Sequence, residues 1–219
     1  MSVKIVSLSE SFIESEDKSR NLTPEECIVY CARVSNPSNQ LNTETSSNLL
    51  KYLITHKHWS PFEMVSMCVE IKTTRAIAAQ ILRHRSFSFQ EFSQRYSTAT
   101  EVEHIEWRKQ GKTNRQVGDA KIDVSSEMSE KVYNLQKETI KLYETLVNDH
   151  GIARECARMI LPLNTKTTLY MSGMIRSWIH YVDIRSKEDT QKEHRNLAVQ
   201  VKEILMKNFP NISEALEWK

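Results

Sequence analysis

The residues with the clearest chemical potential lie in one segment, residues 83–97, which reads RHRSFSFQEFSQRYS. It combines three arginines, one histidine and one glutamate with three phenylalanines and one tyrosine. An exposed basic face does not need so many aromatic rings. A packed core does not tolerate so many guanidinium groups, because an unpaired buried charge is very costly. The mixture suits the wall of a pocket, where rings supply flat apolar surface and guanidinium groups hold planar anions through paired hydrogen bonds.

Two later segments add further arginines, Arg158 in one and Arg176 with Arg185 in the other. Guanidinium groups from three segments could clamp phosphate groups and stabilise negative charge on a planar ring. The sequence has no G-x-S-x-G motif, Ser93 has no evident base beside it, and no cysteine stands where its pKa would be predictably lowered. Covalent catalysis by the protein is therefore not favoured, and redox chemistry would fall to a cofactor.

Two of these arginine groups also have a purely structural interpretation. Residues 83–85 stand at the expected end of a helix, where the helix dipole favours cations by about 0.3–1 kcal/mol. Arg176, His180 and Arg185 are about one turn apart, which fits either an exposed basic stripe or a ligand-facing stripe. The residues that follow the first group, Glu91, Ser93, Arg95 and Tyr96, favour a ligand site there over a simple helix end.

The composition indicates a soluble globular protein and argues against a function in nucleic-acid binding. The chain has 219 residues, of which 39% are apolar and 26% charged, with a net charge of +2. A nucleic-acid binder usually has a stronger basic excess. The positive charge is instead concentrated in residues 75–95, which points to a small anionic ligand. No apolar run approaches the roughly 20 residues of a membrane span.

Neither the cysteines nor the histidines form a recognisable metal motif. The four cysteines contain no C-x-x-C pair, and no secretory signal precedes them, so we expect reduced thiols in a cytoplasmic protein. Cys27 and Cys31 share a helix face but would need two more ligands. His56 and His58 lie in a loop with no H-E-x-x-H helix after it. We therefore expect no metal.

Glycine is scarce, with four residues, and neither G-x-G-x-x-G nor a P-loop is present. Any nucleotide or flavin must then be held by side chains and helix ends. The chain has no internal repeat, low-complexity tract or Pro/Gly-rich linker, which favours one domain over residues 1–219.

Strands and helices alternate along the chain, which predicts an α+β or α/β fold. Alternation and β-branched residues predict strands, and apolar spacing with capping residues predicts helices. The expected strands are 3–8, 64–72 and 165–172, and the expected helices are 24–34, 43–55, 74–84, 125–149, 152–160, 174–184, 189–208 and 211–218. Residues 98–122 are polar and form an expected exposed excursion to which the sequence assigns no role.

Four motifs in register give the sequence a resemblance to a known family. Arg83-His84-Arg85 followed after seven residues by Ser93 resembles the signature of the flavin-dependent thymidylate synthases. Residues 58–63 (HWSPFE), 158–163 (RMILPL) and 176–185 (RSWIHYVDIR) resemble three further elements of that family. Order and spacing agree over about residues 50–205.

The resemblance implies a methyltransferase and flavoprotein with a central, mostly antiparallel sheet flanked by helices, the thymidylate synthase-complementing protein fold. It implies reductive methylation of dUMP to dTMP without a covalent enzyme nucleophile. The carbon donor is 5,10-methylenetetrahydrofolate, and FAD reduced by NADPH is the hydride donor. It also implies a cytoplasmic homotetramer whose active sites are shared between subunits.

The resemblance also carries residue roles. Arg185 is the implied catalytic residue, which stabilises negative charge on the uracil. The implied dUMP contacts are Gln80, Arg83, Glu91, Ser93, Arg95, Arg158 and Arg185. The implied FAD contacts are His58, Ser60, Arg83, His84, Arg85, Glu91, Arg176 and His180.

Two other functions remain open from the residues. The Arg/aromatic segment could belong to a non-catalytic protein that binds single-stranded nucleic acid, although the modest net charge disfavours this. The chain could also be a flavoenzyme that acts on another nucleotide.

Overall fold

A four-stranded sheet forms the centre of the computed structural model, which describes residues 1–218. Strands β1 (Ser2–Leu8), β2 (Ser66–Thr74), β6 (Lys166–Met174) and β3 (Ser88–Glu91) lie side by side in that order. Each neighbouring pair is antiparallel. The expected α+β fold with a mostly antiparallel central sheet is therefore confirmed.

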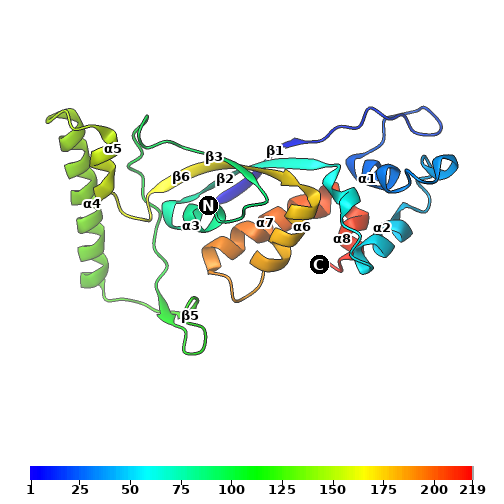
Figure 1. Ribbon diagram of the computed structural model, residues 1–219. Coiled ribbons are helices and arrows are strands. Elements are labelled where there is room, and N and C mark those ends of the chain that lie inside the picture. Colours follow the sequence, from blue (N-terminus) through cyan, green and yellow to red (C-terminus); the bar gives the residue numbers. More distant parts are fainter. Residues whose placement is uncertain (219) are drawn as a thin grey trace.

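Helices cover one face of this sheet and extend the molecule at both ends (Figure 1). Beneath the sheet lie α3 (Arg75–Ile81), α6 (Ile175–Arg185) and α7 (Lys192–Asn208). One end is formed by α1 (Pro24–Ala32), α2 (Ser46–Thr55) and α8 (Pro210–Ala215), and the other by α4 (Ser126–Asn148) and α5 (Arg154–Ala157). Single turns of 3-10 helix occur at Pro37–Asn39, Ser60–Glu63 and Arg158–Ile160.

The alternation of buried and less buried residues in and just before β2 explains how the sheet packs against its helices. Val65, Met67, Val69 and Ile71 are all buried, as the pattern predicts, whereas Ser66, Cys68, Glu70 and Lys72 alternate with them and are less buried. The buried series joins one apolar core with residues of α3, α6 and α7. One strand therefore supplies both a core face and an outward face.

The core has a tight contact between an aromatic ring of residues 83–97 and a glycine of β6. A Cβ added to Gly173 would lie 2.5 Å from Cδ1 of Phe87, so only glycine fits beneath this ring. The ring of Phe87 packs edge-on against Trp178, with centroids 4.6 Å apart. Trp178 in turn donates to the carbonyl of Gly173 at 3.1 Å. Phe87 is thus a core anchor for the segment and not a wall of an open pocket.

Capping residues place several helices where the sequence predicts them. Thr23 and Glu26 form both hydrogen bonds of a capping box at α1. Thr74 caps α3 and Ser125 caps α4 through their side-chain oxygens. Gly151 has a φ of 65°, a left-handed conformation that suits the turn after α4.

Several boundaries differ from the sequence-based expectations. The helix expected over 74–84 ends at Ile81, because residues 82–87 form turns that lead into β3. The helix expected from residue 43 begins at Ser46, and the one expected to residue 218 ends at Ala215. Strand β3 was not expected, because residues 88–91 acquire their strand geometry by pairing with β6.

The amphipathic pattern of α4 predicts the helix correctly, but several of its apolar residues are exposed. Met128, Leu135 and Leu142 are 50%, 65% and 51% exposed, and the helix's one buried residue is Tyr143. The physical reason is position, since α4 stands at one end of the molecule and packs on one side only (Figure 1). Its remaining apolar surface is therefore free in a single chain.

The excursion over residues 98–122 carries a two-stranded sheet of β4 (Arg108–Gln110) and β5 (Gly118–Lys121). It is not merely exposed, because Arg108 forms an ion pair with Glu193 of α7 at 2.6 Å. Lys192 adds a second link, to Glu106 at 2.7 Å. These pairs attach the excursion to the start of α7.

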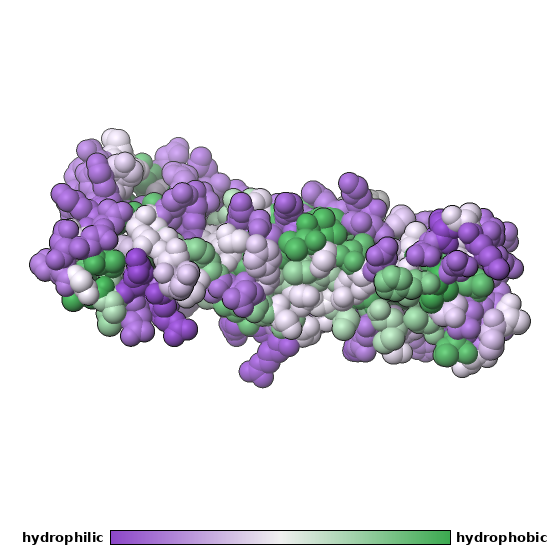
Figure 2. All heavy atoms as spheres, turned by 90° about the horizontal axis from the view of Figure 1, so that it is seen from above, coloured by the Kyte–Doolittle hydropathy of each residue, from purple (hydrophilic) through white to green (hydrophobic). Residues whose placement is uncertain are grey.

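The upper face of the sheet has no helix over it in the part of the chain that the structure describes (Figure 1). Figure 2 views this face and shows apolar side chains gathered over its middle. Val6 and Met174, on β1 and β6, are 52% and 45% exposed. Within residues 1–218, no helix is both long enough and apolar enough to cross a membrane.

A buried carboxylate joins the two ends of the chain. Glu25 of α1 accepts hydrogen bonds from the backbone N–H of Ile212 at 2.7 Å and from Asn211 Nδ2 at 2.8 Å. It therefore caps α8 from a distant part of the sequence. Burial raises the pKa of Glu25, and these hydrogen bonds only partly offset that effect.

We expect Glu25→Ala to reduce the free energy of unfolding by about 1–3 kcal/mol, because a buried N–H group of α8 loses its acceptor. Urea unfolding followed by circular dichroism measures this loss. The control is Glu214→Ala, an exposed residue of α8, which should change the value by less than about 0.5 kcal/mol. Equal effects of the two substitutions would contradict the assigned cap.

Candidate functional site

Two of the expected site residues bind each other directly. Arg185, at the end of α6, donates from Nε to Nε2 of His84 at 3.0 Å. His84 follows α3 and is half-buried, with its ring against the edge of Tyr181 at a centroid distance of 5.0 Å. Because Nε2 accepts this bond, a neutral His84 carries its proton on Nδ1.

The surroundings keep His84 uncharged. Burial, and then the positive charge of Arg185, lower the pKa of His84 to about 4. A neutral imidazole can accept a hydrogen bond from a guanidinium, whereas an imidazolium would repel it. The contact therefore fixes one side of Arg185 and leaves its other N–H groups for an anion.

Gln80 lies one turn before His84 and is held on both sides of its carboxamide. Its Nε2 donates to Gln191 Oε1 at 2.7 Å, and its Oε1 lies 3.3 Å from Nδ1 of His194. His194 is fully buried and also contacts the Tyr181 hydroxyl at 3.1 Å. Sequence reasoning missed His194, although a histidine among the apolar positions of a predicted helix was a usable signal.

Glu91 lies on the opposite flank of the segment and is half-buried. Arg75, the first residue of α3, pairs with it at 2.8 Å and also donates to the carbonyl of Phe92 at 2.7 Å. Thr167 of β6 donates to the same carboxylate at 3.0 Å. Glu91 is thus held by two residues that sequence reasoning did not single out. Arg75 keeps a buried Nε without a hydrogen-bond partner.

Four other expected arginines have no partner of their own. Within residues 1–218, no hydrogen bond or ion pair engages the guanidinium groups of Arg83, Arg85, Arg95 and Arg158. The first three are exposed, and Ser93 in the same segment of the sequence is exposed as well. Unpaired guanidinium groups are suited to bind phosphate or carboxylate ligands.

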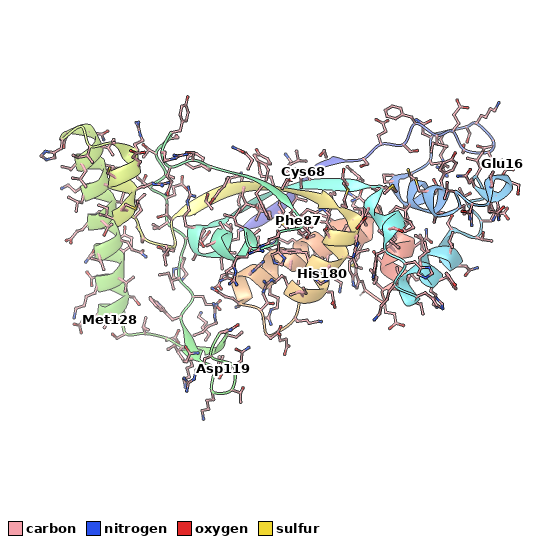
Figure 3. All side chains as sticks on the ribbon, in the orientation of Figure 1. Glu16, Cys68, Phe87, Asp119, Met128 and His180 are labelled. Atoms are coloured by element: carbon pink, nitrogen blue, oxygen red, sulfur yellow. The ribbon has the colours of Figure 1, made fainter. Side chains whose placement is uncertain are left out.

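Arg176 and His180 lie together at a separate cavity of about 590 Å³. Lys57, Trp59 and Glu63 also line it, and Arg176 forms an ion pair with Glu63. Figure 3 shows His180 on the lower side of α6. The expected contacts His58 and Ser60 are exposed and flank Trp59 in sequence.

Arg185 does not share a stripe with Arg176 and His180. A helix turns about 100° per residue, so positions 176 and 180 nearly coincide while position 185 points to the other side. Arg185 accordingly hydrogen-bonds to His84, whereas Arg176 and His180 line the cavity. The single stripe expected from the sequence spacing is therefore divided between two places.

One chain does not gather all the expected residues. Gln80, His84 and Arg185 form one group, and Glu91 with Arg75 forms another. Arg158 directly follows α5, which lies beside α4 at one end of the molecule, whereas α6 lies beneath the sheet (Figure 1). No group of three or more His, Cys, Asp and Glu side chains that could hold a metal ion occurs in residues 1–218.

Comparison with known proteins decides the family. The model for "Thymidylate synthase complementing protein" matches residues 19–211. The chain belongs to the flavin-dependent thymidylate synthases. It is 51% identical to the "Flavin-dependent thymidylate synthase" of Synechocystis sp., and the match covers 100% of both chains. It is 49% identical to the "Probable flavin-dependent thymidylate synthase" of Paramecium bursaria Chlorella virus 1, also over 100% of both.

A solved structure shows the same fold. The UMP/dUMP methylase PolB from Streptomyces cacaoi, bound with 5-Br dUMP, superposes with a TM-score of 0.80. The match covers 98% of this chain and 93% of that one at 24% identity. At this identity the likeness shows a shared fold and nothing more. A flavin cofactor follows from membership of the family.

Two uncharged histidines, His84, which is half-buried, and His194, which is buried, make the stability of the fold depend on pH. In an unfolded chain an imidazole binds a proton near pH 6.5. In the fold, burial and then the charge of Arg185 lower the pKa of His84 to about 4 and that of His194 to about 3. At a pH below 6.5 but above the pKa values in the fold, the unfolded state binds more protons than the folded state. These two residues therefore reduce the free energy of unfolding as the pH falls.

We expect the urea midpoint to fall when the pH is lowered from about 7.5 to about 5.5, a range above the titration of ordinary carboxylates. His194→Asn should show a weaker fall, because asparagine does not titrate. Comparing the two proteins isolates the contribution of His194. Identical pH dependence in both would contradict a buried neutral histidine.

Proposed function

We propose that this enzyme methylates dUMP to dTMP, taking its carbon from 5,10-methylenetetrahydrofolate and using FAD that NADPH reduces. The observation that carries the proposal is the full-length identity of 49% and 51% to two flavin-dependent thymidylate synthases. The free thiols of Cys27, Cys31, Cys68 and Cys156 suit a reducing compartment, and we place the activity in the cytoplasm.

The nucleotide would be bound by the guanidinium groups that lack partners. Arg83, Arg95 and Arg158 offer planar, permanently charged donors that match a phosphate group. Ser93 can donate its hydroxyl beside them, and Gln80 offers a carboxamide held in one place by Gln191. Glu91 would stand at the boundary between nucleotide and flavin, held by Arg75.

Arg185 would stabilise the reacting base. The bond to neutral His84 orients the guanidinium before substrate binds. Its remaining N–H groups can then face the negative charge that develops on the uracil as its ring carbon attacks the methylene group. A donor held in place at the site of developing charge lowers the barrier without reorganisation.

The cavity beside α6 fits part of a flavin dinucleotide. Trp59 supplies a flat apolar wall, while Arg176, His180 and Lys57 supply donors for phosphate or ring oxygens. Residues His58, Ser60, Arg83, His84 and Arg85 would complete the binding surface. When bound, reduced FAD supplies the hydride that converts the transferred methylene group to methyl.

Assembly of four chains would complete each site. Several large apolar side chains have no cover in a single chain, including Tyr96 at 88% exposed, Met159 at 77% and Leu163 at 73%. Together with the exposed face of α4, they exceed the scattered exposure of a typical monomer. Tyr96 and Met159 are neighbours in sequence of Arg95 and Arg158, so an interface there would bring these arginines to another chain.

Arg185→Ala should reduce the rate of dTMP formation by roughly 100-fold or more, the usual loss when one preorganised donor is removed. The assay is anaerobic, with dUMP, folate, NADPH and added FAD. Lys187→Ala, an exposed residue two positions away, is the control and should keep full activity. Undiminished dTMP formation in Arg185→Ala would overturn the assigned role.

The same preparation separates the other two candidate functions. A colourless protein that ignores FAD and retards single-stranded DNA would support a nucleic-acid binder. A yellow protein with no turnover of dUMP would support a flavoenzyme of another nucleotide.

Subunit mixing tests the shared site. Arg95→Ala and Arg185→Ala should each be nearly inactive. If the two arginines reach one nucleotide from different chains, randomly reassembled mixtures should regain about a quarter of wild-type activity, because some sites receive both intact residues. A mixture no more active than its parents would show that both residues act within one chain.

A further inference from the structure

A chain of hydrogen bonds runs from the excursion to Gln80, and it begins at an ion pair. Arg108 of β4 donates to Glu193 Oε1 at 2.6 Å. Burial is the largest single effect and raises the pKa of Glu193, but the hydrogen bonds from Arg108, Gln191 and the backbone, with the charge of Arg108, together outweigh it and lower the pKa overall. Glu193 is therefore a carboxylate at neutral pH and can only accept hydrogen bonds.

This single charge decides the direction of every bond that follows. Glu193 Oε2 accepts from Gln191 Nε2 at 2.9 Å, so the Gln191 oxygen must face the other way, toward Gln80. The amide nitrogen of Gln80 then donates to that oxygen at 2.7 Å, and the Gln80 oxygen faces His194 at 3.3 Å. A flipped Gln80 would place two oxygens opposite each other.

The same hydrogen-bond direction continues from Gln80 into the core, where it selects the tautomer of His194. Since Gln80 offers an oxygen, Nδ1 of His194 must carry the proton, and Nε2 must accept from the Tyr181 hydroxyl at 3.1 Å. Both residues are 0% exposed, so no water competes for these bonds. Burial lowers the pKa of His194 to about 3 and raises that of Tyr181, which keeps the ring neutral and the phenol protonated.

We propose that His194 is a positioning residue that, with Gln191 and the Arg108–Glu193 ion pair, locks the Gln80 carboxamide in one orientation for the nucleotide. The inference rests on the proposed function, in which Gln80 contacts dUMP. It gives the excursion over residues 98–122 a role, because Arg108 anchors the polarity of the chain.

The lock matters because it decides what Gln80 presents. One N–H of Nε2 and one lone pair of Oε1 are engaged by Gln191 and His194. The second N–H and the second lone pair remain, each on a fixed side of the amide. A rotated amide would exchange donor and acceptor, so a nucleotide group bound by the N–H would meet an oxygen.

A matched pair of substitutions separates positioning from packing. The amide nitrogen of asparagine can take the place of Nδ1 and donate to Gln80, whereas glutamine reaches the place of Nε2 and leaves Gln80 without a donor. We expect His194→Gln to raise the KM for dUMP by about 5–10-fold, the loss of one buried hydrogen bond. His194→Asn should stay within about 3-fold of wild type. The kcat and FAD affinity should change little in both.

Glu193→Gln tests the origin of the polarity. Its amide can donate or accept, so Gln191 and Gln80 are free to rotate, and the KM for dUMP should rise as in His194→Gln. The double variant of Glu193→Gln and His194→Gln should show no further rise in the KM for dUMP, because both changes release the same lock. The control is Glu106→Gln, which weakens the pairing of Arg108 and Lys192 but keeps the Glu193 carboxylate. It should leave the KM for dUMP near the wild-type value.

Nitrogen-15 NMR of histidine-labelled protein reads the tautomer directly. Wild type should show neutral His194 with the proton on Nδ1. A proton on Nε2, or equal KM values for the Asn and Gln variants, would overturn the lock. If wild type bound FAD but did not methylate dUMP, the proposed function would fail instead, while the NMR result would stand by itself.

Discussion

The proposed function of this molecule depends on four positive charges that have no partner within the described chain. The guanidinium groups of Arg83, Arg85, Arg95 and Arg158 find no anion within the described chain, although its net charge is only +2. Other arginines form ion pairs within the described chain, among them Arg75, Arg108 and Arg176. Under the proposed function, an anionic nucleotide would supply the partners that the fold does not give these groups.

The remaining polar groups of the site are held by neutral partners. His84 and His194 are both kept uncharged by burial, and each accepts a hydrogen bond at Nε2. A charged imidazole in either place would repel Arg185. Neutral histidines thus let the site hold a guanidinium and an amide in fixed directions without adding positive charge. In the proposed site, distant residues would act on the nucleotide through the direction of these hydrogen bonds.

Local patterns along the chain were enough to predict the elements but not their partners. The alternation through β2 and the capping box at Thr23 depend only on nearby residues, and both are confirmed. Strand β3 depends on pairing with β6, whose paired residues lie 78 to 84 positions later in the sequence, so no local pattern could reveal it. Ser88 of β3, for example, pairs with Ser172 of β6. The exposure of apolar residues on α4 could not be predicted for a related reason, since amphipathicity does not say whether the covering surface belongs to the same chain.

In the candidate site too, the sequence indicated residue types but not the contacts between distant residues. Residue types and spacing singled out Arg185 and His180, but the angle between these two positions places their side chains on different sides of α6. His194 and Gln191 escaped notice because their importance lies in contacts with Gln80, more than 100 residues away in sequence. The roles carried by resemblance remain predictions until a nucleotide is seen among these side chains.

A crystal structure of the assembled protein with dUMP tests the central claim most directly. The account predicts one nucleotide within hydrogen-bond distance of Arg83, Ser93, Arg158 and Arg185, contributed by more than one chain. It also predicts that Arg185 still donates to His84. These four side chains on separate surfaces, with all copies in the assembly considered, would contradict it.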